Sequence, residues 1–265
     1  MKETTNKFSR RKAINVTLGV AGLAAGGSLA AQNGLLCSAP SAPQALGPFF
    51  PRPGSPEMAV RENSDPAVPI YNANDNDLTF VKGLSGKASG QVVNIKGILQ
   101  DASCKPIAGA RIIIWQASET GRYNHLGDIP NQDFIDPRNG NIIKRSLDPN
   151  FQYWGQALTD DAGVYNFKTI VPGFYPADLA SQWYRPPHIH FLVLATGFNQ
   201  FVTQMYFRGK DIKDNDFIQE LNAKDLLLQN PQLSAIEREK LVVDFVLDNK
   251  SNEHYGNFDL TLNRL

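Results

Sequence analysis

The chain has 265 residues, of which 42% are apolar and 26 are aromatic, so it can bury a core and is not disordered throughout. Two cysteines are too few for a disulfide scaffold, and 21 glycines without a strict period exclude a collagen. The 26 basic and 26 acidic residues cancel, but five bases and one acid fall in residues 1–31, which leaves 21 bases against 25 acids in the remainder. This mildly acidic body gives nucleic acid no electrostatic reason to bind.

The first 31 residues have the layout of an export signal. Arg10 and Arg11 stand side by side ahead of a Gly- and Ala-rich, moderately apolar stretch that ends in small residues. A basic segment, an apolar segment and a small-residue cleavage site make a signal peptide, and the paired arginines indicate the twin-arginine type over residues 1–31. The sequence thus predicts export to the periplasm or the extracellular space, with no stable membrane span once the signal is removed. An uncleaved anchor is the alternative, which so many Gly and Ala residues disfavour.

Proline dominates the next part of the chain. Eight of the 17 prolines lie in residues 32–70, where the apolar residues show no periodicity. Such a composition predicts an extended arm and loops over residues 32–89 and no separate domain. A regular pattern begins near residue 90, so we expect one folded domain over residues 90–265.

Short runs with alternating apolar side chains fill most of residues 90–265. Such runs, rich in β-branched residues and separated by turns that contain Gly, Asp and Pro, predict strands joined as hairpins. Strands at this spacing indicate a mostly β, single-domain β-sandwich with long loops. We expect strands at residues 92–99, 110–115, 155–159, 164–170, 188–195, 200–207, 242–247 and 258–262.

Helical patterns are confined to the end of the chain, near residues 215–229 and after Ser234. There Ser234 and Glu237 have the spacing of a capping box, in which each side chain bonds to the backbone N–H of the other residue. One or two short helices near the C-terminus therefore complete the expected fold. Residues 120–152, by contrast, are thick with Gly, Asn, Asp and Pro, and so long an irregular segment is typical of a functional loop.

Two of the four histidines, His188 and His190, lie two residues apart in an expected strand. Side chains alternate between the faces of a strand, so both imidazoles project from one face, with Cα atoms ~6.5–7 Å apart. That separation lets them converge on one metal ion, and the remaining ligands decide between zinc, copper and iron. The sequence near the pair has no cysteine and no acidic residue at short spacing, which argues against a structural zinc, a blue-copper site or a local facial triad. Two ordinary histidines on a polar face are the alternative.

Two tyrosines stand in motifs around these histidines. Tyr175 lies thirteen residues before His188, and Tyr123 follows the expected strand that contains Trp115. A phenolate is a hard anionic donor that suits ferric iron, as in the tyrosinate ligand of catalase haem. A single tyrosine is far more often a core or surface residue, so neither position decides anything alone.

Taken together, these motifs resemble those of the intradiol ring-cleavage dioxygenases, in particular the protocatechuate 3,4-dioxygenase-like and exported branches. The resemblance implies a β-sandwich oxidoreductase with one non-haem Fe(III) per chain. Such an enzyme opens a catechol-type ring between its two hydroxylated carbons with O2 and forms a muconate-type diacid. The similarity covers residues 46–265 and rests on five motifs in order: Gly47–Pro51, Gly121–Tyr123, Pro172–Pro176, Arg185–Phe191 and Thr203–Phe207.

Carried over motif by motif, the resemblance assigns metal ligands and catalytic side chains. Arg185 matches the arginine beside the substrate, and Gln204 matches the glutamine behind the ring. Tyr175 is implied to be catalytic as well, because in this family the axial tyrosinate leaves the metal as the catechol binds and takes a substrate proton. The implied metal ligands are Tyr123, Tyr175, His188 and His190.

The resemblance also implies the partners, which are a small catechol-type molecule and O2. Family members are commonly dimers or larger, which leaves room for a homo-oligomer. Residues 126–150 are longer than the family pattern, which predicts a reshaped pocket mouth. The sequence does not define the ring, and a carboxylated ring would need a cation at the rim, for which the candidates are Arg111, Arg122, Lys144 and Arg145.

Two other classes of protein share part of this pattern. A non-catalytic transthyretin-like module that binds carbohydrate or protein has the same hairpin pattern, but it has no need of Arg185 beside two histidines. A zinc or copper hydrolase or oxidase would use the two histidines alone. Of the other candidates, His125 lies two residues after Tyr123 and is expected at a polar loop position, with a supporting place beside the metal ligands as the alternative, and His254 is expected in a solvated loop. Whether Cys37 pairs with Cys104 in an oxidising compartment stays open.

Overall fold

The computed structural model describes residues 39–50, 75–125, 127–128 and 133–265. The expected signal peptide, much of the expected arm, and Cys37 lie outside the described residues, and all described residues belong to the compact unit from Leu35 to Leu265. Cys104 is disulfide-bonded, as is common in exported proteins, and export itself stays a prediction. Among the described helices, none has the length and apolarity that a membrane span requires.

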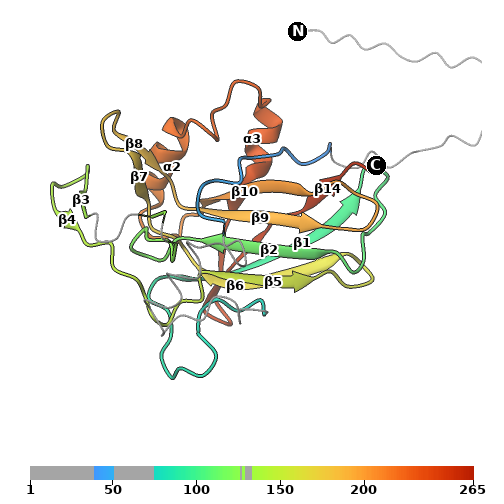
Figure 1. Ribbon diagram of the computed structural model, residues 1–265, viewed down its shortest axis with the longest axis horizontal. Helices are drawn as coiled ribbons and strands as arrows, with labels where there is room; N and C mark the ends of the chain where they lie inside the picture. Colours follow the sequence, from blue (N-terminus) through green and yellow to red (C-terminus); the bar gives the residue numbers. More distant parts are fainter. Residues whose placement is uncertain (1–38, 51–74, 126, 129–132) are drawn as a thin grey trace, which may run out of the picture. The chain divides into compact units, whose positions relative to one another are not determined.

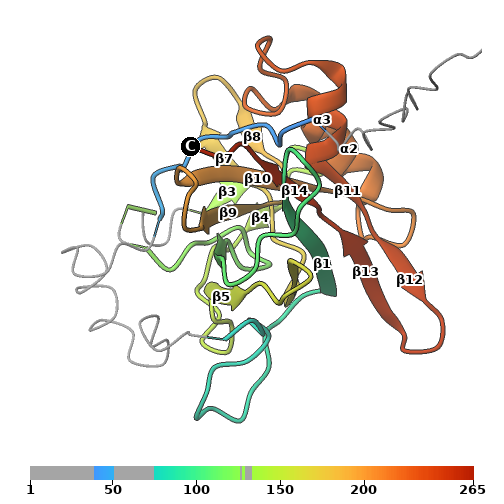
Figure 2. The same ribbon diagram turned by 90° about the vertical axis from the view of Figure 1, so that its right-hand side faces the viewer.

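Two five-stranded sheets form the body of this unit (Figures 1 and 2). The first sheet contains β1 (Val92–Asp101), β6 (Val164–Ile170), β12 (Val246–Asp248), β13 (Glu253–Asn257) and β14 (Leu260–Leu262). The second contains β2 (Arg111–Gln116), β5 (Trp154–Leu158), β9 (His188–Leu194), β10 (Phe201–Arg208) and β11 (Val242–Asp244). The first has the order β12–β13–β1–β14, with β6 also paired to β1, and the second has the order β11–β10–β9–β2–β5.

The apolar faces of the two sheets meet in one core. Along β1, Ile95 and Leu99 are buried while Lys96 is exposed, which is the period-two pattern of a strand with one covered face. Aromatic side chains join the layers, because the ring of Phe191 on β9 lies 6.2 Å from that of Phe167 on β6, centroid to centroid. The expected mostly β sandwich is thereby confirmed.

Strand β9 is buried on both faces. Ile189 and Phe191 belong to the sandwich core, so His188 and His190 project from the opposite face of the strand. On that outer face, β2 places Trp115 across from His190, so an aromatic ring lies next to the imidazole. The expectation that the two histidines share one face is confirmed.

Segments from several parts of the chain pack around the second sheet. Figure 1 shows the blue segment, residues 39–50, running beside β10, where the N–H of Gln44 donates to the carbonyl of Val202 (2.9 Å) and Thr203 Oγ1 donates to the carbonyl of Ala42 (2.8 Å). The small hairpin of β7 (Tyr175–Asp178) and β8 (Trp183–Arg185) and the helices α2 (Asn215–Lys224) and α3 (Ala235–Leu241) complete this side.

Several elements differ from the expectation. Helix α2 ends at Lys224, not near residue 229, because Asp225 has extended backbone angles. The expected strand 242–247 divides into β11 and β12, and Phe245 between them bonds to the backbone of Arg208 while the chain passes from one sheet to the other. The capping box of α3 is confirmed. Strands too short or too polar to show a period were missed, namely β7, β8, β13, β3 (Phe134–Ile135) and β4 (Ile142–Ile143).

Candidate metal centre

Four buried donor side chains from three stretches of the chain meet beside β9. Tyr123 lies in the loop after β2, Tyr175 begins β7, and His188 and His190 lie on β9, with exposed fractions of 2%, 6%, 1% and 2%. The hydroxyl of Tyr123 lies 3.3 Å from Nε2 of His188. The ring centroids of the two tyrosines are 5.7 Å apart, those of the two histidines 4.9 Å apart, and those of Tyr175 and His188 5.8 Å apart. The structure therefore brings all four predicted ligands together.

The backbone orients the His188 ring. Its Nδ1 lies 2.7 Å from the carbonyl oxygen of Pro186, which can only accept a hydrogen bond, so the proton is assigned to Nδ1. Nε2 then turns its lone pair toward the Tyr123 hydroxyl, which is the arrangement of a metal-binding histidine with its second nitrogen held. Burial, and then the charge of Arg185, lower the pKa of both His188 and His190 well below the usual 6.5, so both imidazoles are neutral.

The two phenols share a dry environment. Burial raises the pKa of Tyr123 well above its usual value of 10.0 and also raises that of Tyr175, while the nearby Arg185 opposes both shifts. Both hydroxyls are therefore protonated unless a bound metal cation replaces the proton. Within the described ranges, no group of three or more His, Cys, Asp or Glu residues could hold a metal ion, and the oxygen donors that lie beside the two histidines are those of the tyrosines. Two imidazoles and two phenols suit a hard cation such as ferric iron.

Glycines let the tyrosine-bearing segments approach each other. Gly121 has a φ of +76°, and a Cβ built there would stand 2.4 Å from the carbonyl oxygen of Phe174. Gly173 has the same role from the other side, since a Cβ there would stand 2.2 Å from the carbonyl oxygen of Glu119. The glycines of the Gly-Arg-Tyr and Pro-Gly-Phe-Tyr motifs are thus required by backbone contact between the two segments.

A buried charged cluster holds the Tyr123 loop. Asp128 Oδ2 accepts the backbone N–H of Tyr123 (2.7 Å) and a bond from Nη2 of Arg145 (2.8 Å), and Nη1 of Arg122 donates to the carbonyl of Arg145 (2.7 Å). Arg122 and Arg145 are 2% and 3% exposed. Two of the four cations considered for the substrate rim are therefore structural and buried. Sequence reasoning missed Asp128, whose only signal was its position in the long irregular segment.

Arg185 and Gln204 lie together beside the four donors. Arg185 Nη2 donates to Oε1 of Gln204 (2.6 Å), and Gln204 Nε2 donates to the carbonyl of Ala45 (2.8 Å). Arg185 Nε donates to Oδ2 of Asp225 (2.7 Å), and Nη2 lies 3.3 Å from the hydroxyl of Tyr206. Burial lowers the pKa of Arg185, but the neighbouring Tyr175, Tyr206 and Asp225 raise it by more, so the guanidinium stays charged. From the sequence, Tyr206 stood only as a member of the Thr203–Phe207 motif, without a role of its own, and Asp225 was not singled out.

The segment 39–50 contributes an aromatic wall. The ring of Phe49 lies 4.7 Å from that of Tyr123 and 6.4 Å from that of Tyr175, centroid to centroid. It also lies 5.9 Å from the ring of His125, which is 7% exposed and accepts the N–H of Gly127 through Nδ1. His125 therefore lies in a loop, as expected, but it is buried, because Phe49 and the loop itself cover it.

The fourth histidine also differs from expectation. His254 lies on β13 and is half-buried, with its Nε2 3.2 Å from Nε2 of Gln91. The Asn-, Lys- and Ser-rich stretch that suggested a solvated loop ends just before it, and the strand pairs in parallel with β1. It lies on the first sheet, whereas the four donors gather at the second.

Gly47 packs closely against His190, and this contact predicts the effect of a side chain at Gly47. His190 stacks on Trp115 with ring centroids 4.8 Å apart and an angle of 9° between the rings, while Gly47 covers it with a φ of +76°. A Cβ at Gly47 would stand 3.0 Å from Cε1 of His190. Gly47→Ala should therefore lower the free energy of unfolding by about 1–2 kcal/mol, the usual cost of a left-handed residue with a side chain, and displace the His190 ring. Chemical denaturation measures the first effect, and unchanged stability and metal affinity would contradict this account.

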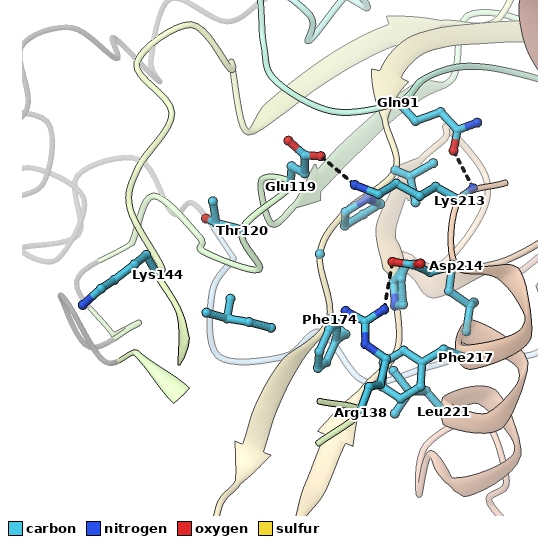
Figure 3. A pocket seen from close by; sticks show the side chains of 16 residues that line it. Gln91, Glu119, Thr120, Arg138, Lys144, Phe174, Lys213, Asp214, Phe217 and Leu221 are labelled. Carbon is cyan, nitrogen blue, oxygen red and sulfur yellow. Dashed lines mark hydrogen bonds and ion pairs between the residues drawn. The ribbon is translucent and has the colours of Figure 1, made fainter. Parts of the chain in front are cut away.

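A separate pocket of about 310 Å³ lies beside this cluster of donors (Figure 3). Its lining includes Phe174 and Pro187, which adjoin two of the donors in sequence, but none of the four donors themselves. Arg138 reaches across it, with its guanidinium carbon 4.6 Å from the ring centre of Phe217 and an ion pair of 2.9 Å to Asp214. Part of the long segment 126–150 thus packs on α2, and its effect on the mouth of the metal centre stays a prediction.

The fold and the donors define a β-sandwich protein whose central strand presents two imidazoles to two buried phenols, a set suited to a metal ion. A protein-family model described as "Dioxygenase" matches residues 66–249. The chain belongs to the intradiol ring-cleavage dioxygenase family, whose members are generally iron-dependent. The resemblance of the motifs to this family is confirmed, and so is the expected class of enzyme, an oxidoreductase that cleaves aromatic rings with O2.

Individual relatives cover different parts of the chain. It is 32% identical over 209 residues to the protocatechuate 3,4-dioxygenase beta chain of Burkholderia cepacia, a match to 76% of this chain and 79% of that protein. It is 28% identical to the catechol 1,2-dioxygenase of Acinetobacter baylyi, over 67% of this chain and 53% of that protein, so it spans about half of that relative. In fold it is similar to the 3-chlorocatechol 1,2-dioxygenase of Rhodococcus opacus, with a TM-score of 0.53 at 20% identity, covering 85% of this chain and 74% of the other.

Proposed function

We propose that this protein is a non-haem Fe(III)-dependent intradiol dioxygenase. It opens a catechol-type ring between the two hydroxylated carbons and forms a muconate-type diacid. The observation that carries the proposal is the meeting of two buried phenols with two buried, neutral imidazoles, in which the hydroxyl of Tyr123 lies 3.3 Å from Nε2 of His188. Zinc or copper would need no tyrosine, and a binding module would need no such cluster.

The residues that would hold the ion are Tyr123, Tyr175, His188 and His190. When bound, ferric iron would supply a Lewis acid for the reaction of a catechol-type ring with O2. The two histidines enter this role without losing a proton, because both are already neutral. The two tyrosines would give up theirs, and the two phenolates would offset two of the three positive charges of the ion in a buried site.

Tyr175 and Arg185 then act on the substrate. A catechol must lose protons to bind as an anion, and Tyr175 Oη is the base that takes one of them. The guanidinium of Arg185, fixed by Gln204, offsets negative charge that develops on the ring during the reaction. The ring of Phe49 packs on Tyr123 and the ring of Trp115 on His190, so both rings limit the access of water to these two side chains.

Removal of the Tyr175 hydroxyl should separate metal binding from substrate binding. In Tyr175→Phe three donors remain, so we expect part of the iron to be retained, while substrate binding slows roughly 100-fold because the base is lost. Tyr123→Phe is the matched comparison, since Tyr123 contacts His188 and should cost more iron. Metal analysis and stopped-flow mixing with a catechol measure both effects, and equal behaviour of the two variants would contradict the separate roles.

Oxygen uptake with a panel of rings tests the proposed function directly. Catechol, protocatechuate, hydroxyquinol and a chlorocatechol are offered to the iron-loaded protein, and the products are analysed for cleavage between the hydroxylated carbons. The iron-loaded protein should be red-brown, because ferric tyrosinate absorbs in the visible range. A colourless protein that leaves every ring intact would overturn the proposal in favour of a binding module or a zinc enzyme.

A further inference from the structure

The guanidinium of Arg185 is held by a buried carboxylate that no motif indicated. Asp225 is 0% exposed and follows α2 directly, whereas Arg185 ends β8, so the pair joins two elements 40 residues apart. Oδ2 of Asp225 accepts from Nε of Arg185 at 2.7 Å. The opposite charges meet with side-chain exposures of 6% and 0%, and so the contact is dry.

The carboxylate is itself fixed by the backbone. Oδ1 of Asp225 accepts the N–H groups of Leu227 (3.1 Å) and Leu228 (2.8 Å) in the turn after α2. Oδ1 therefore bonds to the backbone of the turn, and Oδ2 bonds to the arginine. Because the turn fixes the carboxylate independently of Arg185, Asp225 can determine the orientation of the Arg185 guanidinium.

The other bonds of Arg185 complete a rigid frame. Nη2 donates to Oε1 of Gln204 at 2.6 Å and lies 3.3 Å from the hydroxyl of Tyr206, which is itself 3.4 Å from Oδ1 of Asp225. Both Nε and Nη2 are thus engaged by side chains that are at most 2% exposed. The orientation of the plane of the guanidinium is set from β10 on one side and from the end of α2 on the other.

We propose that Asp225 is a positioning residue for ring cleavage, which fixes the direction of the Arg185 guanidinium and offsets its charge next to the metal centre. The inference rests on the proposed function, because it assigns a partner to the arginine of that site. A buried guanidinium without its carboxylate would repel the bound cation and turn toward the nearest phenolate. Asp225 prevents both without touching the substrate.

The two oxygens of Asp225 allow its structural and positioning roles to be separated. In Asp225→Asn the amide oxygen can still accept the N–H groups of Leu227 and Leu228, but the amide nitrogen faces the N–H of Arg185 and repels it. Asp225→Ala loses both contacts. Asp244→Asn is a matched control, since that carboxylate is 60% exposed and faces Arg208 far from the donors in sequence and on another strand.

A double-mutant cycle with Arg185→Gln tests the proposal. Asp225→Asn should lower kcat by roughly 10–100-fold, as expected for a misplaced charged group, with iron content and visible colour close to those of the wild type. The thermal midpoint should fall, because the buried guanidinium of Arg185 loses its carboxylate, so rates are compared at a temperature where each variant is folded. In the Arg185→Gln background it should add nothing, because the group that it positions is gone. Titration of a catechol into each iron-loaded variant, monitored by the change in visible absorption, measures substrate binding separately from turnover.

Each outcome of this cycle decides the inference. Unchanged kcat in Asp225→Asn beside an active wild type overturns the positioning role alone. Losses that multiply in the double variant overturn it as well, because they would show that Asp225 acts on the fold and not through Arg185. A wild type that cleaves no ring overturns the proposed function, and the inference with it. Asp244→Asn should match the wild type throughout.

Discussion

Replacement of His188 by alanine should leave a folded sandwich that no longer binds iron or cleaves a ring. Loss of an outer partner of a metal ligand typically weakens metal affinity 10–100-fold, so loss of a ligand should weaken it by at least ~100-fold. The fold should persist because His188 projects from the outer face of β9, away from the core residues Ile189 and Phe191. We expect the metal-free variant to lose about 1–3 kcal/mol of stability from the vacated space. Metal analysis, visible absorption and thermal unfolding of the metal-free proteins measure these effects.

His254→Ala is the matched control for this experiment. His254 also lies on a strand and is half-buried, but its ring contacts Gln91 and lies on the other sheet. Iron content and colour should equal those of the wild type in this variant. If His188→Ala kept its iron, or if His254→Ala lost it, the donor set assigned to the metal would be wrong.

The sandwich was predictable because its strands carry their own signal. Consecutive residues of β1 and β6 alternate between buried and exposed side chains, and β9 is a dense run of apolar residues, so each strand can be recognised from its own sequence. The short hairpin of β7 and β8 has no such signal, since three or four residues that include Pro176 show no period. The hairpin becomes visible only in the structure, where Tyr175 pairs with Arg185 across its two strands.

The same distinction applies to the site. The four candidate donors stand in ordered motifs, and the reason for two of these motifs is visible in the backbone, where Gly121 and Gly173 permit contacts that a residue with a Cβ would not allow. Asp128 was marked only by its position in the long irregular segment, and Asp225 stood in no motif. Each acts through a partner brought near by folding, Tyr123 in one case and Arg185 in the other, so their roles appear only in three dimensions.

Arg185→Gln should nearly abolish ring cleavage while iron remains bound. Removal of a single group that stabilises developing negative charge typically costs 10²–10³-fold in kcat, and we expect a loss of about this size. Iron should stay, because none of the four donor atoms is removed, and the colour of the protein should persist. Stability should fall by about 3–5 kcal/mol, since the carboxylate of Asp225, with 0% of its side chain exposed, is left buried without its cation.

Two further variants test whether the effect of Arg185→Gln comes from the loss of this particular guanidinium. Arg185→Lys keeps a positive charge but has one nitrogen where the guanidinium bonds through Nε and Nη2, so it should recover part of the stability and little of the rate. Arg208→Gln removes a guanidinium of the same size that is 36% exposed and pairs with Glu239, and it should change neither rate nor iron content. The rates are compared at a temperature where each variant is folded, as monitored by circular dichroism. A lysine variant as fast as the wild type would mean that charge alone suffices, and the frame built by Gln204 and Asp225 would then have no catalytic purpose.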